Sequence, residues 1–258
     1  MWRIRIDSTG NRLALEVRDP DLLLTHFYTL DATAFTLSQL PLNSSKAWWQ
    51  GLEDTQDGKV YLHGYGDRKT GQHKGVTALA AESGAVLWEQ GDLVFYGIVE
   101  EGLLAYEADA PEHALTILDA DTGKATRAGV DQQEAAREVA SYSQSRYHNC
   151  VFPVLYKEGE PYFDDVCNFL RVQSGFSPVR AVAYAETSHC IVVSYYEAGA
   201  ESNLDNFVAV YDLEGRLVLK VKLGSGLSGI GSDTFFIFNL RLYLLLDRRI
   251  LQVYRLLA

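Results

Sequence analysis

The histidines and cysteines are the residues of this sequence best suited to bind a metal ion. Zinc sites usually show cysteines two to four residues apart, or histidines at helical spacing. The closest His/Cys pairs, His148 with Cys150 and His189 with Cys190, have neither spacing, and would form a site only by meeting across neighbouring sheets. We therefore expect no metal ion and no cofactor. All three cysteines, Cys150, Cys167 and Cys190, are predicted to be buried thiols.

The stretch "GDRKTGQH" (66–73) begins like a phosphate-binding loop. Its two glycines have the right separation, but Gln72 and His73 replace the Lys-Ser/Thr pair of that motif. No helix is predicted to follow and supply an N-terminal dipole. The simpler interpretation is a polar loop between two strands, at 64–75. Its candidate ligand- or partner-binding residues are Arg68, Lys69, His73 and Lys74.

Two adjacent tryptophans, Trp48 and Trp49, are the most suggestive surface candidates. On a strand, neighbouring side chains point to opposite faces of the sheet. One ring is therefore expected between packed sheets, while the other reaches a rim and could contact a sugar ring or a partner protein. Burial of both rings as packing residues is the alternative.

No serine, cysteine or carboxylate pair has the spacing of a catalytic motif. The adjacent acids Glu100–Glu101 and Asp164–Asp165 would point to opposite faces of a strand, so neither pair converges like the carboxylates of a glycosidase. Residues gathered from several sheets could still catalyse a reaction, and the sequence leaves any catalytic residue unknown. Glu100 and Glu101 are retained as candidates for binding a partner.

The charge is strongly negative and uneven. The formal net charge is -11, and the segment from Glu82 to Glu138 holds 13 acidic residues against 3 basic ones. This balance disfavours nucleic-acid binding and could steer a basic partner protein. The start of the chain lacks the apolar region of a signal peptide, and no apolar run could cross a membrane. We expect a cytoplasmic monomer that does not bind membranes.

A repeated phrase organises the chain. "GVTALAAESGAVLW" (75–88) returns as "ALTILDADTGKAT" (114–126) and "NFVAVYDLEGRLVLKVKL" (206–223). Each phrase predicts a strand, a tight turn and a second strand. An acid before the turn can accept hydrogen bonds from the turn's N–H groups, and glycine supplies the positive φ. We therefore predict positive φ at Gly84 and Gly123.

Further apolar runs precede each phrase, so the repeating unit has about four strands and a period of about 40 residues. This pattern predicts an all-β chain with a single β-propeller domain over 1–258, because the strands are apolar on both faces, as in stacked blades. Strand groups starting near 12, 58, 102, 150, 190 and 241 indicate six blades, with five or seven as alternatives. A pair of β-sandwich domains is a further alternative.

Two details complete this prediction. A short helix is predicted over 130–143, because Asp131 and Glu134 have capping-box spacing before a small apolar face. The last blade shows only three strands, and residues 2–6 are predicted to supply the fourth.

The phrases "VTALAAESGAVLW" (76–88) and "LTILDADTGKAT" (115–126) resemble the repeats of quinoprotein and WD40-like β-propellers. This resemblance implies how blades pack. It implies no quinone, calcium or activity, because no position here matches the residues that hold those groups. The chain also resembles a Bacteroidetes-type bacterial family, domain of unknown function 4905. That resemblance is carried by "LALEVRD" (13–19), "AWWQGL" (47–52), "HKGVTAL" (73–79) and "SGAVLWE" (83–89).

These observations favour a non-catalytic propeller that binds a partner protein or a small ligand on one face. The alternative is an enzyme, possibly acting on carbohydrates, with its site across a central channel. A channel lined by three or more convergent acids and a histidine would favour the enzyme, whereas an apolar or plugged channel would favour the binding module.

Overall fold

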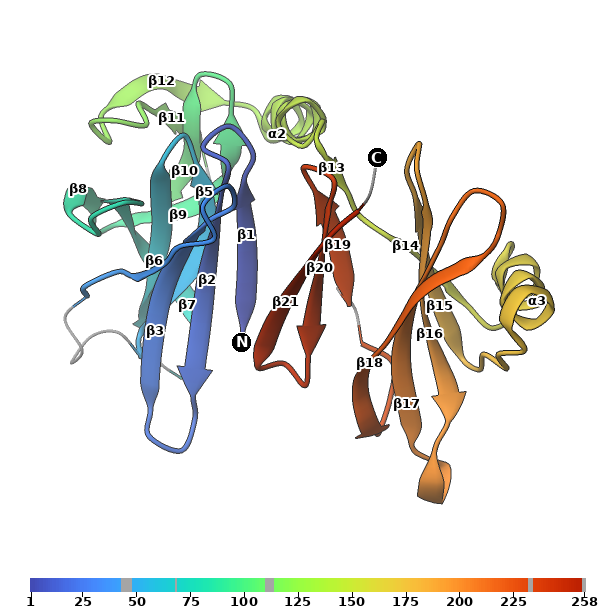
Figure 1. Ribbon diagram of the computed structural model, residues 1–258. Coiled ribbons are helices and arrows are strands. Elements are labelled where there is room, and N and C mark those ends of the chain that lie inside the picture. The colour runs from blue at the N-terminus through green and yellow to red at the C-terminus, as the bar shows by residue number, and fades with distance from the viewer. Residues whose placement is uncertain (43–47, 68, 110–113, 232–233, 257–258) are drawn as a thin grey trace. The chain divides into compact units, whose positions relative to one another are not determined.

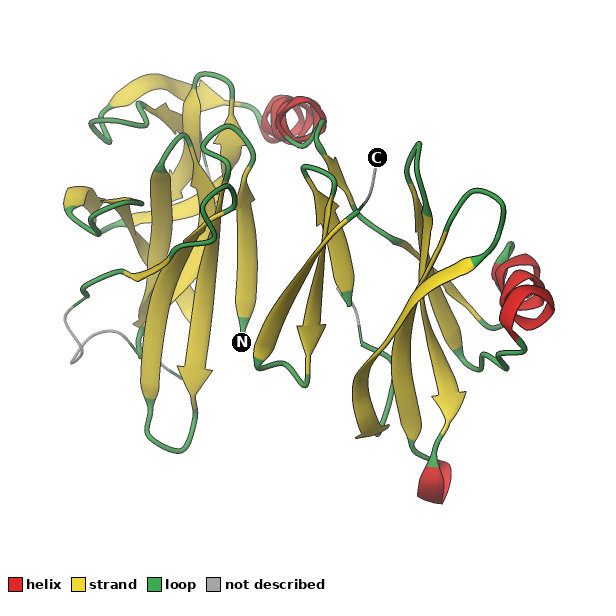
Figure 2. Ribbon diagram, viewed as in Figure 1, coloured by secondary structure: helices red, strands yellow, loops and turns green. Residues whose placement is uncertain are grey.

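The computed structural model describes residues 1–42, 48–67, 69–109, 114–231 and 234–256 (Figure 1). Two compact units divide the chain, Met1–Tyr147 and His148–Ala258. Strands dominate both units (Figure 2), which confirms the all-β prediction. In the described part of the chain, no helix combines the length and the apolar character needed to cross a membrane.

The described part of the first unit contains three antiparallel sheets of four strands each, in which sequential strands are neighbours. Sheet 1 comprises β1 (Arg3–Asp7), β2 (Arg12–Asp19), β3 (Leu24–Asp31) and β4 (Leu37–Gln39). Sheet 2 comprises β5 (Gln50–Gln56), β6 (Lys59–Asp67), β7 (Gln72–Ala80) and β8 (Val86–Gln90). Sheet 3 comprises β9 (Leu93–Val99), β10 (Gly102–Glu107), β11 (Leu115–Leu118) and β12 (Ala125–Val130).

Sheet 2 buries both of its faces, as a propeller blade must. On β6, Val60 and Leu62 belong to a core shared with sheet 1, whereas Tyr61 belongs to a core shared with sheet 3. All three side chains are at most 1% exposed. This part of β6 therefore has no polar face, because successive side chains point to opposite sides and each side packs against another sheet.

The repeated phrase forms hairpins whose turns contact the preceding sheet. Gly84 and Gly123 have φ of 70° and 66°, which confirms the prediction of positive φ at both. Trp88 of β8 donates its indole N–H to the Ala120 carbonyl at 2.9 Å, and its ring lies against Gly123. A Cβ on Gly123 would lie 2.6 Å from the Trp88 ring. The tryptophan of one phrase thus packs on the turn of the next.

Helix α2 (Gln132–Arg146) follows β12, so the predicted helix exists and extends three residues beyond the predicted end. Asp131 caps it by accepting hydrogen bonds from the backbone N–H groups of Gln133 and Glu134. At its last residue, the buried Arg146 guanidinium makes two 3.0 Å contacts with the Asp54 carboxylate. This ion pair fastens the end of the helix to β5.

The second unit contains two sheets among its described residues. Sheet 4 orders its strands β14-β15-β16-β17-β18, and sheet 5 orders them β13-β19-β20-β21. Sheet 4 comprises β14 (Val154–Lys157), β15 (Ala181–Glu186), β16 (Ile191–Ala198), β17 (Leu204–Tyr211) and β18 (Leu217–Leu227). Sheet 5 comprises β13 (Cys150–Val151), β19 (Phe235–Phe238), β20 (Arg241–Leu246) and β21 (Ile250–Arg255).

Sheet 5 obtains its fourth strand from β13, which pairs with β19 through Cys150–Phe238 and Val151–Ile237. The prediction that residues 2–6 complete this sheet is therefore wrong. Those residues largely form β1, the first strand of sheet 1. The two-residue strand at Cys150 is too short to be recognised from an apolar pattern.

A second helix, α3 (Phe163–Ser174), covers sheet 4, and a 3-10 turn, η1, spans Ala200–Ser202. The prediction of a single helix is therefore wrong. The adjacent acids Asp164 and Asp165 lie in the first turn of α3 rather than on a strand.

The described residues form five sheets, one of the predicted alternatives, and the preferred count of six is not confirmed. The six-blade prediction assigns the strand groups near 150 and 190 to two blades, but β14 and β16 belong to the same sheet. The described cysteines form no disulfide. Cys150 is half-buried, and Cys167 and Cys190 are buried.

Candidate metal centre

The sequence-derived surface candidates occupy different places on the first unit. Trp48 and Trp49 lie in the turn before β5, not on a strand, and both are half-buried. The Arg18 guanidinium lies over the Trp48 ring at 5.3 Å, whereas Trp49 meets Tyr65 edge-on at 6.1 Å. The sequence predicts either one buried ring and one ring at a rim, or two buried rings. Two half-buried rings in a turn match neither prediction.

The expected polar loop over 64–75 is largely a hairpin, because β6 continues to Asp67 and β7 begins at Gln72. The prediction of a loop is wrong here, since most of these polar residues lie on a two-stranded extension and only a short turn joins its strands. Lys69 is exposed in the turn, and Arg68 lies outside the described residues. His73 and Lys74 are on β7.

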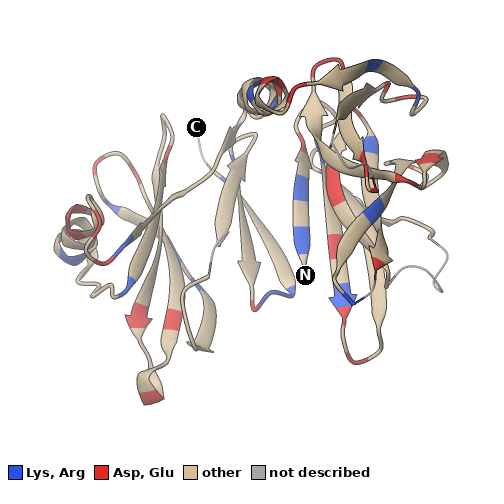
Figure 3. Cartoon of the chain, turned by 180° about the vertical axis from the view of Figure 1, so that it is seen from behind, with Lys and Arg blue, Asp and Glu red and all other residues tan. Residues whose placement is uncertain are grey.

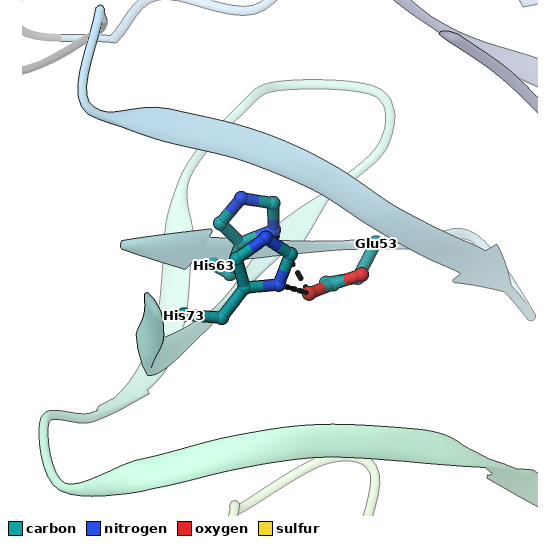
Figure 4. Close-up of side chains that lie close together, drawn as sticks. All are labelled: Glu53, His63 and His73. Atoms are coloured by element: carbon teal, nitrogen blue, oxygen red, sulfur yellow. Dashed lines mark hydrogen bonds and ion pairs between the residues drawn. The ribbon is translucent and has the colours of Figure 1, made fainter. Parts of the chain in front are cut away.

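His73 is the one candidate that the fold brings into a cluster suited to chemistry. Its Nδ1 lies 2.8 Å from Oε1 of Glu53, and Nδ1 of His63 lies 2.9 Å from the same oxygen (Figure 4). The two imidazole rings stack with centroids 3.5 Å apart and planes 12° apart. One ligand atom from each of the three residues falls within 4.8 Å of the others. Among the described residues, this is the one group of three or more histidine, cysteine or acidic side chains close enough to hold a metal ion.

Three strands of sheet 2 supply this cluster, and two irregularities align them. On β5, the register shifts between Leu52 and Asp54, so Glu53 is the extra residue of a β-bulge. On β7, the register shifts again around Gly75, whose φ is 90°, so that His73 lies opposite Tyr65. Bulges redirect side chains that regular alternation would separate.

Gly51 provides the space for the buried imidazole. It lies opposite His63 across β5 and β6, and a Cβ at this position would overlap the His63 ring. The chain thus has a residue without a side chain where the imidazole must be accommodated.

The three side chains range from buried to accessible. The exposed fractions are 2% for His63, 12% for Glu53 and 35% for His73. Neither ring nitrogen of His63 makes a well-aligned hydrogen bond within the described structure, although Nδ1 is close to Glu53. Buried polar atoms without such a bond are uncommon and unfavourable.

The electrostatics favour an ionised Glu53 carboxylate and a neutral His73 imidazole. Burial opposes ionisation of Glu53, but the close approach and charge of His63, and then those of His73, outweigh it, so the pKa of Glu53 is lowered. Burial, followed by the charge of the stacked His63, lowers the pKa of His73, although Glu53 opposes this shift. At neutral pH the lone pairs of a neutral imidazole can serve as metal ligands.

Cationic and aromatic groups surround the cluster. An Arg3 nitrogen lies 3.7 Å from Glu53, and Arg5 donates to the Glu53 carbonyl at 2.7 Å. Figure 3 shows this basic character along β1. Tyr65 meets the His63 and His73 rings edge-on at 5.1 and 5.6 Å, so ring contacts continue from the cluster through Tyr65 to Trp49.

The remaining candidates do not join this cluster. Lys74 forms ion pairs with Asp109 at 2.7 Å and Asp92 at 3.3 Å. Glu100 and Glu101 are exposed in the turn between β9 and β10, and Glu101 lies 3.9 Å from Arg127. Several acids of the 82–138 segment are therefore partly neutralised within their own unit, which reduces the field available to attract a basic partner.

Sequence reasoning missed Glu53 and His63 because they lie ten residues apart along a β-hairpin, where no zinc-motif spacing applies. His63 and His73 share a face because the pairing of β6 with β7 is irregular, and a regular hairpin register would have placed them on opposite faces.

Among known families, the model described as "Domain of unknown function (DUF4905)" matches residues 6–88. This stretch covers nearly all of sheets 1 and 2 and contains all three residues of the cluster. The resemblance predicted from the sequence is therefore confirmed for this part of the chain. A comparison with curated proteins finds no significant match.

Similar solved structures include the β-propeller domain of the trilobed protease from Pyrococcus furiosus, at 10% identity and a TM-score of 0.33. That alignment covers 97% of this chain and 79% of the other. A structure of prolyl endopeptidases aligns at 12% identity and the same TM-score of 0.33, covering 97% of this chain and 41% of the other. The assignment of sheets to propeller blades rests on their antiparallel order of four or five strands.

Proposed function

We propose that this protein is a non-catalytic binding module whose ligand at sheet 2 is a divalent transition-metal ion, held by Glu53, His63 and His73. The observation that supports this proposal most directly is the convergence of two imidazoles on one carboxylate oxygen, in a place where the buried His63 lacks an aligned hydrogen bond. A metal ion bound to the ring nitrogens would replace the missing partner of one of them.

The donor set limits which ions fit. Imidazole nitrogen with a carboxylate oxygen suits zinc, nickel, copper or iron, whereas calcium and magnesium prefer sites built from oxygen. Three protein ligands leave at least one coordination position for another group. The partly exposed His73 marks the side from which such a group could approach. The bound ion would therefore present an open position to a small anionic ligand or to a partner's side chain.

An enzyme is the second candidate, and the same open position favours it. Catalytic zinc sites commonly combine three protein ligands with a water molecule. A metal-bound water is itself the nucleophile in such sites, so a turnover measurement separates the enzyme from the binding module. Turnover of a chromogenic ester or phosphate ester by the zinc-loaded chain, lost in His73→Gln, would support the enzyme over the binding module.

The proposal is tested by titrating the chelator-treated full chain with Zn²⁺ by calorimetry and with Co²⁺ by visible absorption. We expect one ion per chain. We also expect Glu53→Gln and His73→Gln to lower the affinity at least about 10- to 100-fold, the range seen even for loss of outer partners. His26→Gln is the matched control, because His26 is a half-buried histidine of sheet 1 outside the cluster. Binding that is absent, or equally strong in all variants with native circular dichroism, would refute the proposal.

A further inference from the structure

A second potential binding site lies in the other unit, between α3 and sheet 4. The structure contains a pocket of about 280 Å³ there. Tyr156, Tyr184 and Ile191 come from β14, β15 and β16, and the register places all three on one face of the sheet. Helix α3 contributes Asp165, Val166 and Phe169. The pocket therefore has a sheet on one side and a helix on the other.

The lining is mainly aromatic. Tyr162, at the start of α3, completes it, with its ring 5.7 Å from the Tyr156 ring at an interplanar angle of 57°. Tyr162 is 65% exposed although it is a large aromatic residue. Its φ of 68° is unusual for such a residue. Together with Phe169 and Tyr184, these residues place four aromatic rings around one small volume.

The charge around the pocket is negative. Asp165 contributes a carboxylate to the lining, and no lysine, arginine or histidine is among the described lining residues. The segment 156–165 contains four acidic residues and one lysine. Tyr184 donates its hydroxyl hydrogen to Glu186, which places a further carboxylate beside the tyrosine ring. An anion would be repelled here, whereas a cation would meet both a carboxylate and aromatic faces.

We propose that this pocket binds an ammonium cation, with Asp165 providing the opposite charge and the tyrosine and phenylalanine rings providing cation–π contacts. Aromatic cages of this composition recognise quaternary ammonium groups and methylated lysine. The volume lies near the lower end of ligand sites, which suits a small head group rather than an extended molecule. This site is independent of the metal centre, since it uses other residues in the other unit.

The test measures binding of choline and tetramethylammonium to the full chain by NMR titration. The neutral isostere 3,3-dimethylbutanol is the ligand control, because it has the shape of choline without the charge. We expect choline to bind at least about tenfold more tightly than the isostere, in line with a desolvated cation–π contact plus one carboxylate. Equal binding of the two, or no binding of either cation, would overturn the proposal.

Variants locate the site. Asp165→Asn should weaken choline binding at least about fivefold, whereas Asp164→Asn should leave it within about twofold. These two acids are adjacent and exposed in the same helical turn, and only Asp165 lines the pocket. Tyr162→Ala, at an exposed position, should weaken binding without unfolding the chain. A peptide with trimethyllysine, titrated in parallel, distinguishes a protein side chain from a small molecule as the source of the cation. Equal effects of the two Asp→Asn variants would refute the assigned role of Asp165.

Discussion

Replacing Gly123 with alanine tests whether the contact between the repeated turns and the preceding sheet matters for stability. Two costs can be separated. The left-handed backbone, with φ of 66°, costs about 1–2 kcal/mol for a residue with a Cβ. The new Cβ would also lie 2.6, 2.7 and 2.9 Å from three atoms of the buried Trp88 ring. Overpacking of this kind costs about 1–3 kcal/mol. The expected total is about 2–5 kcal/mol.

Gly58 provides a control for the backbone cost. Its φ is 72°, and an added Cβ would have no neighbour within 4 Å among the described atoms. Gly58→Ala should therefore cost only the backbone part, about 1–2 kcal/mol. Urea denaturation followed by tryptophan fluorescence gives both free energies of unfolding.

A double variant tests whether the difference in unfolding free energy between Gly123→Ala and Gly58→Ala comes from the Trp88 ring. In a Trp88→Leu background the clash is removed, so Gly123→Ala should cost about as much as Gly58→Ala. The coupling energy between positions 88 and 123 should then be about 1–3 kcal/mol. The reasoning is refuted if Gly123→Ala and Gly58→Ala are equally destabilising, or if the cost at Gly123 is the same in both backgrounds.

Three further predictions follow from buried or hydrogen-bonded groups. Arg146→Met should destabilise the first unit by about 3–5 kcal/mol in urea, because Asp54 loses its buried partner, and a loss below about 1 kcal/mol would contradict this. The Thr122 hydroxyl and N–H lower the pKa of Asp119. The stabilising effect of the ionised Asp119 carboxylate is therefore present above the ordinary carboxyl pKa and is lost as the pH falls through the lowered value. Carboxyl NMR titration should show that Thr122→Val raises this pKa, and an unchanged midpoint would argue against the role of the turn. Burial, and then Asp164, raise the pKa of Cys167 to about 11, so alkylation of this thiol at pH 8 should be slow until urea unfolds the chain. The half-buried Cys150 can react separately, so the label is located by mass spectrometry, and rapid labelling of Cys167 in the native protein would disprove its burial.

The parts of the fold that the sequence predicted are those set by local chemistry. The positive φ at Gly84 and Gly123 and the cap at Asp131 each depend on a few adjacent residues. Helix α3 escaped prediction although Phe163, Val166, Cys167 and Leu170 have helical spacing, because aromatic and branched residues also favour strands and a short apolar pattern does not separate the two.

The metal centre could not be predicted in this way. The positions of Glu53 and His73 depend on bulges in β5 and β7, and a shift of register by one residue moves a side chain to the other face. No composition or spacing rule reports where a strand bulges. The pairing of β13 with β19 escaped prediction for a related reason, since the two strands lie far apart along the chain.

The pairing of β13 with β19 has a consequence for the order in which the second unit can fold. All of sheet 4 lies in the sequence between these two strands, so sheet 5 cannot be completed until the residues of sheet 4 have been synthesised. Each sheet of the first unit, by contrast, closes through consecutive strands as they emerge. Distant pairings form slowly because the entropy of closing the intervening loop must be overcome first. During synthesis, the first unit can therefore form its sheets one by one, whereas the second gains its final edge contact only when most of its chain is present.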